Sequence, residues 1–399
     1  MANAVPCTNE ILPAGGPGAF YLGRAEKLPQ QLPAEYAGKV RLIYLDPPFG
    51  TGDLFRMQIG GRSVTKPAYT DTLTGDGYIA WMRTVLSGCR ELLSPEGSLY
   101  LHVDYRMAAP LKLLLDELFG AEHFMNEIIW MYKSGGRSTK HFSRKHDTIL
   151  FYRKTRNVYF NIDAAGTPRG PERRNHMRRS VDEAGRVTYS IRTGGKVYTY
   201  HEETPLYPSD VWTDIEHLHQ RDPERNGYAT QKPEALLRRI IGVSSRPGDL
   251  VADLFSGSGT TAAAASAMGR RFLAADSSPF ALYALRRRQS LGHNAVSMLE
   301  EGSSLALHFP AVTKGAAIDA AVWRRGGLCG CEVSGYSADS GAPLIYAALG
   351  ALRGETFRPA AFTYAAAAPL SLRMPAPDGP AALQTVDAEG HQMFWELGV

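Results

Sequence analysis

Short apolar runs alternate with amphipathic stretches over the first third of the chain. Residues 40–46 form an apolar run that ends in Asp46 and is stopped by two prolines, which is typical of a buried parallel strand that opens into a loop. Apolar residues recur at helical spacing over residues 78–93, and residues 97–104 form a second strand pattern that ends in an acid. With a further helix over residues 107–119, the pattern predicts a β-α-β-α order, right-handed crossovers and a mostly parallel sheet.

The pattern breaks down in the middle of the chain and then returns. Residues 126–131 and 146–153 are expected to be two more strands, separated by a polar, basic loop. From residue 155 to about residue 226 the sequence becomes rich in Gly, Pro, Arg and Tyr, and because unstructured loops seldom run this long, we expect an inserted module. The α/β pattern then resumes with these elements: helix 232–243, strand 249–254, helix 260–268, strand 271–275 and helix 280–290.

The composition is that of an ordinary globular protein. The 399 residues suffice for two or three domains, or for one large α/β core with attachments. With 44% hydrophobic and 21% charged residues, the composition argues against wholesale disorder or a fibrous repeat. No apolar run reaches the roughly 18 residues of a membrane span, and the first residues lack the regions of a secretory signal. We therefore expect a cytoplasmic protein without a membrane partner, and the four scattered cysteines fit a reducing compartment.

Positive charge is concentrated in and just before the irregular segment. The chain carries a net charge of only +4, whereas residues 131–200 contain 16 Lys/Arg and 5 Asp/Glu. A polyanion would be attracted to this region. Residues 301–399 contain 6 Lys/Arg and 9 Asp/Glu, so the C-terminal part is a poor candidate for contact with a polyanion.

A glycine-rich turn is expected between a strand and a helix at residues 253–261, with the sequence Asp-Leu-Phe-Ser-Gly-Ser-Gly-Thr-Thr. Gly257 and Gly259 occupy the place where backbone N–H groups can approach a ligand at the carboxyl edge of a sheet. Asp276 ends the next strand, where nucleotide sites place a carboxylate against ribose hydroxyls. A turn without a ligand is the alternative. A dinucleotide is disfavoured because alanine replaces the third glycine of G-x-G-x-x-G.

A second motif, Asp46-Pro47-Pro48-Phe49, follows the first predicted strand. The Asp46 side chain and the Pro47 carbonyl are two hydrogen-bond acceptors that could receive both protons of an exocyclic amino group. Phe49 could stack on the ring that carries this group, as enzymes that extrude a base require. The alternative is a Pro-Pro turn with a solvated Asp46 and with Phe49 in the core.

Together the two motifs resemble those of the AdoMet-dependent DNA amino-methyltransferases. Residues 46–49 resemble the catalytic signature D-P-P-[YF], and residues 253–261 resemble the cofactor loop D-P-F-x-G-S-G-T-T. The catalytic signature comes first, which is similar to the β group, whose recognition segment lies between the two halves of the sheet. Residues 142–152 and 226–234 also resemble family segments, and the resemblance covers roughly residues 40–295. The sequence departs from the family pattern at two positions where proline is usual, Leu254 and Ala229.

The resemblance implies an α/β fold, with the doubly wound, mostly parallel, Rossmann-like sheet of AdoMet methyltransferases. To this core we expect a DNA-recognition insertion and a small β-rich C-terminal appendage to be added. The expected division is a catalytic half (1–154), a target-recognition insertion (155–226), an AdoMet-binding half (227–298) and an appendage without an assigned role (299–399).

The resemblance also implies roles for single residues in the cofactor site. Gly257 and Gly259 would approach the methionine part of AdoMet, and Asp276 would hold the ribose hydroxyls. Asp253 and Lys232 would line the same cleft.

Other candidates carry less specific signals. Phe255 would pack either near the cofactor or in the core. Cys329-Gly-Cys331 lacks a second pair of ligands, so we expect no metal site. The histidines of the basic loop and strand ends are expected to be structural or to face phosphates: His102, His141 and His146. A run in the insertion favours DNA contact over a solvated face, and its arginines are Arg173, Arg174, Arg178 and Arg179.

The implied activity is methyl transfer from AdoMet to the N6 amino group of an adenine flipped out of duplex DNA. Asp before Pro-Pro accompanies adenine more often in this family, and cytosine N4 is the alternative target. A nicotinamide oxidoreductase would leave residues 46–49 and the basic insertion without a role, and a non-catalytic DNA-binding subunit would leave both motifs without one. A homodimer and a partner restriction endonuclease are compatible with the family.

Overall fold

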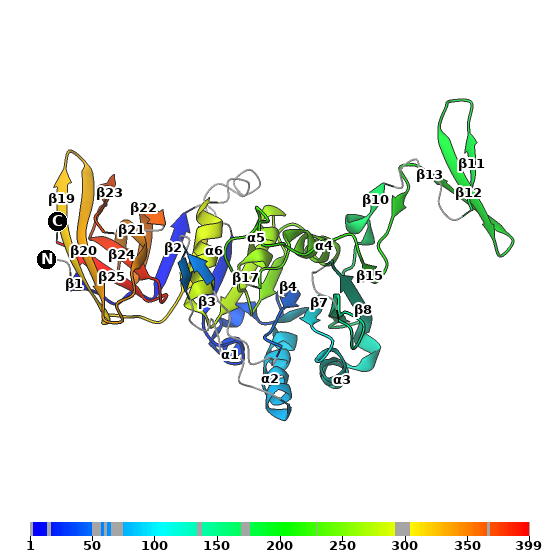
Figure 1. Ribbon diagram of the computed structural model, residues 1–399, viewed down its shortest axis with the longest axis horizontal. Helices are drawn as coiled ribbons and strands as arrows, with labels where there is room; N and C mark the ends of the chain where they lie inside the picture. Colours follow the sequence, from blue (N-terminus) through cyan, green and yellow to red (C-terminus); the bar gives the residue numbers. More distant parts are fainter. Residues whose placement is uncertain are drawn as a thin grey trace.

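Five parallel strands form the centre of the protein, in the spatial order β3–β17–β16–β4–β7 (Figure 1). The order reverses between β16 and β4, because the chain proceeds from β4 to β7 on one side and from β16 to β17 on the other. Beyond β7 the sheet continues with β9 and β8, each antiparallel to its neighbour. The strands of this part are β3 (Gly18–Leu22), β4 (Val40–Leu45), β7 (Leu93–Val103), β8 (Phe124–Met131), β9 (His146–Arg153), β16 (Leu250–Asp253) and β17 (Arg271–Asp276).

The computed structural model describes most of the chain. The described residues are 3–13, 17–49, 57–59, 62–64, 75–133, 138–168, 176–228, 230–291, 304–364 and 368–398.

Helices cover both faces of the central sheet. The helices of the first half are α1 (Leu28–Gln31), α2 (Asp76–Leu92) and α3 (Ala108–Phe119), and those of the second half are α4 (Glu234–Ser244), α5 (Thr260–Ala267) and α6 (Pro279–Leu291). Short 3-10 turns occur at Ala34–Tyr36, Ala121–His123 and Ile162–Ala165.

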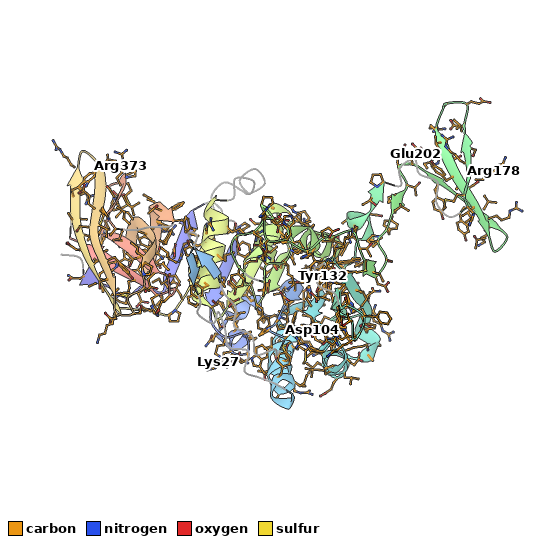
Figure 2. The ribbon with its side chains drawn as sticks, in the orientation of Figure 1. Lys27, Asp104, Tyr132, Arg178, Glu202 and Arg373 are labelled. Carbon is orange, nitrogen blue, oxygen red and sulfur yellow. The ribbon has the colours of Figure 1, made fainter. Side chains whose placement is uncertain are left out.

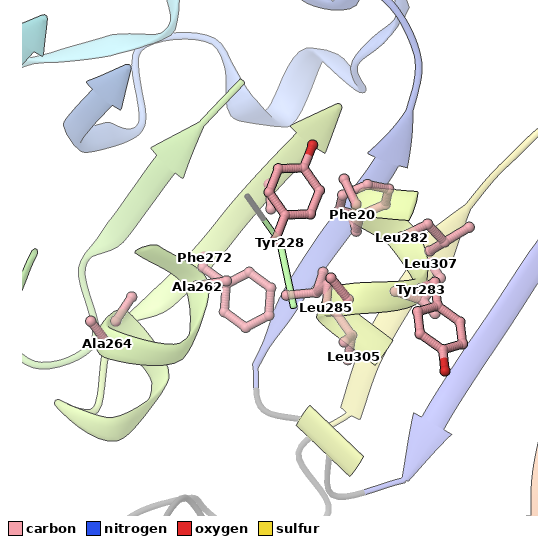
Figure 3. Close-up of a cluster of buried hydrophobic side chains, with 14 of the residues drawn as sticks. Phe20, Tyr228, Ala262, Ala264, Phe272, Leu282, Tyr283, Leu285, Leu305 and Leu307 are labelled. Atoms are coloured by element: carbon pink, nitrogen blue, oxygen red, sulfur yellow. The ribbon is translucent and has the colours of Figure 1, made fainter. Parts of the chain in front are cut away.

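Two separate apolar clusters show that the two sets of helices lie on opposite faces. Along β4, Leu42 and Tyr44 belong to the cluster with α4, α5 and α6, whereas Ile43 and Leu45 belong to the cluster with α2 and α3. Alternate side chains of a strand point to opposite faces, so each face of the sheet is covered by one set of helices. Figure 3 shows part of the first cluster, in which α6 packs on β3, β17 and β18 (Ser304–His308). The prediction of a doubly wound, mostly parallel α/β fold is confirmed.

One predicted boundary differs from the structure. The sequence pattern predicted a helix to residue 93 and a strand from residue 97, but α2 ends at Leu92 and β7 begins at Leu93. Residues 94–97 are part of β7, whose pairing with β4 shifts register there, since Val40 pairs with Leu93 and Leu42 with Ser98. An irregular start of β7 thus occupies the gap between the predicted helix and strand.

The insertion has secondary structure of its own. Its outer part is an antiparallel three-stranded sheet of β11–β13, here called the arm, which projects far from the rest of the protein (Figure 1). Nearer the core, β10 pairs with β14, and β15 extends the central sheet beside β8. The strands are β10 (Thr167–Pro168), β11 (Arg178–Val181), β12 (Val187–Thr193), β13 (Lys196–His201), β14 (Pro205–Leu206) and β15 (Val211–Trp212). A separate short hairpin in the first half consists of β5 (Met57–Ile59) and β6 (Arg62–Val64).

The expected β-rich C-terminal region is present, and it is continuous with the central sheet. Beyond β3, the 15-stranded sheet continues through β18, β2, β22, β21, β24, β25 and β1. A second sheet of β19, β20 and β23 packs on this extension through a third apolar cluster. The strands are β1 (Asn3–Ala4), β2 (Asn9–Pro13), β19 (Ala316–Arg325), β20 (Leu328–Ala338), β21 (Leu344–Arg353), β22 (Thr356–Tyr364), β23 (Leu370–Pro375), β24 (Ala381–Asp387) and β25 (Gln392–Leu397). The N-terminal strands β1 and β2 therefore pair with the C-terminal region, which the sequence pattern did not indicate.

Candidate active site

A cavity of about 510 Å³ lies at the carboxyl ends of β4, β16 and β17. Asp46, Asp253 and Asp276 stand at or directly after the ends of these three strands, and all three line the cavity. This position is the switch point of the sheet, where doubly wound folds bind their ligands. The acids that the sequence placed at three separate strand ends therefore share one site.

The other predicted site residues divide into two groups. Those that also line the cavity are Pro48, Lys232, Phe255 and Gly257. Those that stand just outside its lining are Pro47, Phe49 and Gly259. Phe49 is half-buried and packs against the apolar cluster on the α2 side.

Asp46 and Lys232 form an ion pair at the cavity wall. Lys232 Nζ lies 2.5 Å from Asp46 Oδ2, and each side chain is only 16% exposed. The ammonium also lies 5.9 Å from the centroid of the Phe49 ring. Lys232 is thus in contact with the predicted catalytic motif, whereas the sequence placed it only with the cofactor residues.

The Asp253 side chain stabilises the turn that follows β16. Its carboxylate accepts hydrogen bonds from the Phe255 N–H at 3.0 Å and from the Thr261 hydroxyl at 2.6 Å. Burial, with the nearby Asp46 and Asp276 as smaller causes, raises the pKa of Asp253 to about 7.

Asp276 connects the same turn to β17. Its carboxylate accepts hydrogen bonds from the Gly257 N–H at 2.9 Å and from the Ser278 N–H at 2.8 Å. Burial raises the pKa of Asp276 to about 6, and the backbone donors oppose this rise. A buried carboxylate that already holds the glycine turn is therefore presented to the cavity.

The two glycines are needed for different reasons. Gly257 has φ +47°, and a Cβ there would lie 3.2 Å from the Tyr228 ring at the cavity wall. Gly259 has φ +75° and caps α5, and a Cβ there would lie 2.9 Å from the Leu285 side chain on α6. The left-handed backbone and the packing against α6 therefore both favour glycine at 259, and close approach of Gly259 to a ligand stays a prediction.

Several cavity residues were missed by the sequence argument. Trp81 stands edge-on to Phe255 with ring centroids 5.7 Å apart, and its indole N–H donates to Glu26 Oε2 at 3.0 Å. Tyr228 and Ser256 also line the cavity. Trp81 could not be distinguished from a core residue because it lies at helical apolar spacing, and Glu26 belongs to no motif.

A buried hydrogen-bond chain leads away from the cavity wall. The Tyr44 hydroxyl lies 2.8 Å from His102 Nδ1, and His102 Nε2 lies 3.1 Å from Asp147 Oδ2. The Tyr132 hydroxyl donates to the other oxygen of Asp147 at 3.1 Å. Burial acts to raise the pKa of Asp147, but His102, Lys232 and Tyr132 together outweigh it and lower the pKa of Asp147. Burial raises the pKa of Tyr44. His102 is fully buried within this hydrogen-bond chain.

Two of the four predicted DNA-binding arginines lie on the arm. Arg178 and Arg179 are exposed on β11, and Figure 2 labels Arg178 at the outer part of the arm. Arg173 and Arg174 lie outside the described residues. Cross-strand pairing puts Arg178 on one face with Ser190, and Arg179 on the other with the buried Tyr189.

The described residues offer no group of three or more His, Cys, Asp or Glu side chains that could hold a metal ion. Cys329 and Cys331 are buried in the C-terminal region. Within the part of the chain that the structure describes, no helix is both long and apolar enough to cross a membrane.

The fold and the three acids at its switch point define an α/β enzyme core of the methyltransferase class. Residues 40–287 match the N6/N4 methyltransferase family, which is described as DNA methylase. This match covers more than half of the chain, and the protein belongs to this family.

The relatives include enzymes named for DNA methylation. The chain is 33% identical over 302 residues to the type II methyltransferase M.EcaI of Enterobacter cloacae, covering 64% of this chain and 65% of that relative. It is 30% identical over 281 residues to the DNA adenine methyltransferase YhdJ of Escherichia coli strain K12, covering 68% of this chain and 82% of that relative. Among solved structures, the PvuII DNA methyltransferase, named as cytosine-N4-specific, aligns with a TM-score of 0.44 and 17% identity, over 72% of this chain and 94% of that one.

Proposed function

We propose that the protein transfers a methyl group from AdoMet to the N6 amino group of an adenine extruded from duplex DNA. The observation that carries this proposal is the cavity itself, in which the Asp46 carboxylate and the Gly257–Asp276 turn face the same space. The end of the cavity at Asp46 suits an amine that must be positioned, and the end at Asp276 suits a nucleoside. The division of the chain into residues 1–154, 155–226, 227–298 and 299–399 follows from this assignment.

The cofactor end of the cavity fits AdoMet. Asp276 offers a buried carboxylate for ribose hydroxyls, and Gly257 keeps the turn free of side-chain atoms. The Ser256 hydroxyl is buried at the cavity and has no hydrogen-bond partner among the described residues, so a donor or acceptor of the ligand could satisfy it. Phe255 and Trp81 provide an aromatic wall. When bound, AdoMet supplies an electrophilic methyl group.

Asp46 and Pro47 act on the target amine. The lone pair of an arylamine nitrogen is delocalised into the ring, so the nitrogen is a poor nucleophile. Acceptance of its two protons by the Asp46 carboxylate and the Pro47 carbonyl favours a pyramidal nitrogen and directs its lone pair toward the methyl group. Pro48 restricts the backbone of this loop, and Phe49 stacks on the ring of the base. The contribution is positioning and electrostatics, without a metal or a covalent intermediate.

Adenine is favoured because Asp, and not Ser, stands ahead of Pro47-Pro48. Cytosine N4 is the second candidate, and the family includes both reactions. The carboxylate would accept the same two protons from either amine.

The arm supplies contacts to the DNA. Its polar face carries Arg178 and Arg192 together with Ser190 and Thr199, all on one side of the sheet by cross-strand pairing. The arm projects away from the core, so it can reach base pairs that the cavity does not contact (Figure 1). Phosphate contacts by arginine would account for affinity, and hydroxyl and guanidinium groups can read base edges. The cytoplasm, where DNA and AdoMet are both available, is the proposed location.

Expression in a host free of DNA methylation tests the function directly. Direct long-read sequencing maps the modified positions, and mass spectrometry of the nucleosides identifies the product. N6-methyladenine in cells with the wild-type chain, and not in cells with Asp46→Ala, supports the proposal. N4-methylcytosine as the main product would show that cytosine, and not adenine, is the target base. Unmodified DNA would refute the methyltransferase assignment.

A further inference from the structure

The loop between β8 and β9 lies at the same edge of the sheet as the cavity. β9 runs antiparallel to β7, and Thr148 near its start pairs with Val103 at the carboxyl end of β7. The residues just ahead of β9 are therefore at the carboxyl edge, as is Asp46 after β4, the neighbour of β7. The target base must enter from this edge if the proposed function holds.

The base of this loop is connected to the cavity wall by hydrogen bonds. The Tyr132 N–H donates to the Lys145 carbonyl at 3.0 Å and closes the loop. The Tyr132 hydroxyl binds Asp147, which is linked through His102 to Tyr44 at the cavity. Figure 2 labels Tyr132 and Asp104 in this region, where Asp104 acts electrostatically on the Tyr132 hydroxyl. The chain of contacts fixes where the loop stands relative to the cavity.

Phe142 is 98% exposed in this loop, more than any other large hydrophobic side chain that the structure describes. The polar groups around it bond to each other: the Ser138 hydroxyl accepts from the Lys140 and His141 N–H groups, and His141 Nδ1 donates to the Phe142 carbonyl at 2.9 Å. These bonds stabilise the loop without covering the Phe142 ring. An exposed benzyl group is thus presented on an ordered polar turn.

The surroundings of Phe142 are cationic. The described residues of this segment, 131–133 and 138–145, contain four Lys/Arg and no Asp or Glu. Lys140 is exposed, and the Arg144 guanidinium stacks over the Tyr105 ring at 4.3 Å from its centroid. This charge favours a polyanion over an apolar protein surface as the partner of the loop.

We propose that Phe142 is the wedge that enters the DNA base stack and fills the space left by the extruded base. This inference rests on the proposed function. Extrusion leaves two neighbouring base pairs unstacked, and an inserted apolar side chain restores contact with their faces. Lys140 and Arg144 bind the phosphates on either side of the gap. The hydrogen-bonded loop base holds the wedge at a fixed distance from the cavity that receives the base.

The test compares Phe142→Ala with the wild type on two duplexes that contain the mapped methylation site. One duplex is fully paired, and the other has a mismatch opposite the target base, which removes most of the need for a wedge. Phe142→Ala should lower kcat/KM at least about tenfold on the paired duplex, the size expected when an aromatic ring no longer stacks on a base. On the mismatched duplex the loss should stay within roughly threefold, and Phe142→Trp should retain activity on both duplexes.

Phe160→Ala is the matched control. Phe160 is 42% exposed and follows β9 at the opposite edge of the sheet, where the Tyr159 N–H bonds to the Glu96 carbonyl. The Phe160→Ala variant should keep kcat/KM on both duplexes within about threefold of the wild-type value. Equal losses for Phe142→Ala on the two duplexes, or no loss on either, would overturn the wedge. A wild-type chain that methylates neither duplex would instead refute the proposed function.

Discussion

Lys232 Nζ lies 2.5 Å from Asp46 Oδ2, and this ion pair joins the segment before α4 to the end of β4 across 186 positions of sequence. A cation from the segment before α4 thereby holds the acid of the proposed catalytic motif. Among the described residues, the two carboxylates at the ends of β16 and β17 have no comparable cation, and burial raises the pKa of both. The site therefore contains two kinds of carboxylate. Asp46 is paired with a cation, whereas Asp253 and Asp276 are held by neutral hydrogen-bond donors.

Asp46→Ala should lower the rate of methyl transfer at least about 100-fold, the usual cost of removing a group that acts mainly in the transition state. AdoMet affinity should stay within a few fold, because Asp46 acts on the amine. A single-turnover assay with labelled AdoMet measures the rate, and calorimetry measures the affinity. Retention of more than a tenth of the wild-type rate would contradict the role of Asp46.

Gly257→Ala and Gly259→Ala should have different effects. A Cβ at 259 would meet Leu285 on α6 at 2.9 Å, so Gly259→Ala should lower the melting temperature by disturbing the packing of α5 on α6. At 257 the nearest atom is 3.2 Å away on the Tyr228 ring, which faces the cavity, so AdoMet affinity should fall more than stability. Thermal melts and AdoMet titrations of both variants test these expectations. If both variants change the melting temperature and the AdoMet affinity equally, the two glycines do not have different roles.

The strand-end acids were accessible from sequence because their signal is local. An apolar run followed by Asp and a turn residue identifies a buried strand and its carboxyl end, and parallel strands bring such ends to one edge. The sequence placed Asp46, Asp253 and Asp276 at the ends of three strands, and the resemblance implied that Asp253 and Asp276 lie in one cleft. The sequence could not predict the partner of Asp46, because Lys232 is distant in sequence and its pairing depends on the packing of the two halves.

Other features depend on contacts that leave no local pattern. β2 pairs with β18 and β22, more than 290 positions away, and nothing within residues 9–13 indicates those partners. Trp81 lies in an apolar helical pattern whether it faces the core or the cavity. At Gly259, the contact that a Cβ would make with Leu285 on α6 is a reason for glycine that the motif did not indicate.

AdoMet affinity should fall at low pH because Asp276 must be ionised to accept the ribose hydroxyls strongly. With a pKa of about 6, the affinity should be constant above pH 7 and fall about tenfold per unit below pH 6. The stability of the free protein should change in the opposite direction, since a carboxyl whose pKa is raised on folding favours the folded state at low pH and loses this contribution as pH rises through about 6. AdoMet titrations from pH 5 to 8 measure how the affinity depends on pH. If Asp276→Asn leaves this pH profile unchanged, the dependence belongs to another group.

The two faces of the arm should differ in their contribution to DNA binding. Replacing Arg178 and Arg192 with Gln should reduce the slope of log K against log salt by about 0.9 for each phosphate that is no longer neutralised. Arg179→Gln alters the face with Tyr189 and should change the slope less. Arg373→Gln is the control, because Figure 2 labels Arg373 in the C-terminal region at the opposite end of the protein. Equal slopes for all variants would exclude the polar face as the DNA contact.

The C-terminal region should prove inseparable from the core, because a buried ion pair joins them. Arg286 on α6 bonds to Glu10 on β2 at 2.5 Å, and the two side chains are 1% and 0% exposed. Gln384 on β24 donates to the same carboxylate at 2.8 Å, and Gln392 on β25 accepts from Arg286 at 3.0 Å. Three distant parts of the chain therefore share one network.

Removing one charge of this network should cost more than removing both. Arg286→Met leaves the Glu10 carboxylate buried without its cation and should lower the free energy of unfolding by about 3–5 kcal/mol. Combining it with Glu10→Leu removes the second charge and should recover most of that loss, because an apolar pair of similar volume avoids the desolvation cost. Urea unfolding of Arg286→Met, Glu10→Leu, the double variant and the wild type measures the difference. If the double variant is as unstable as the sum of its single changes, the network acts through packing and not through the pairing of buried charges.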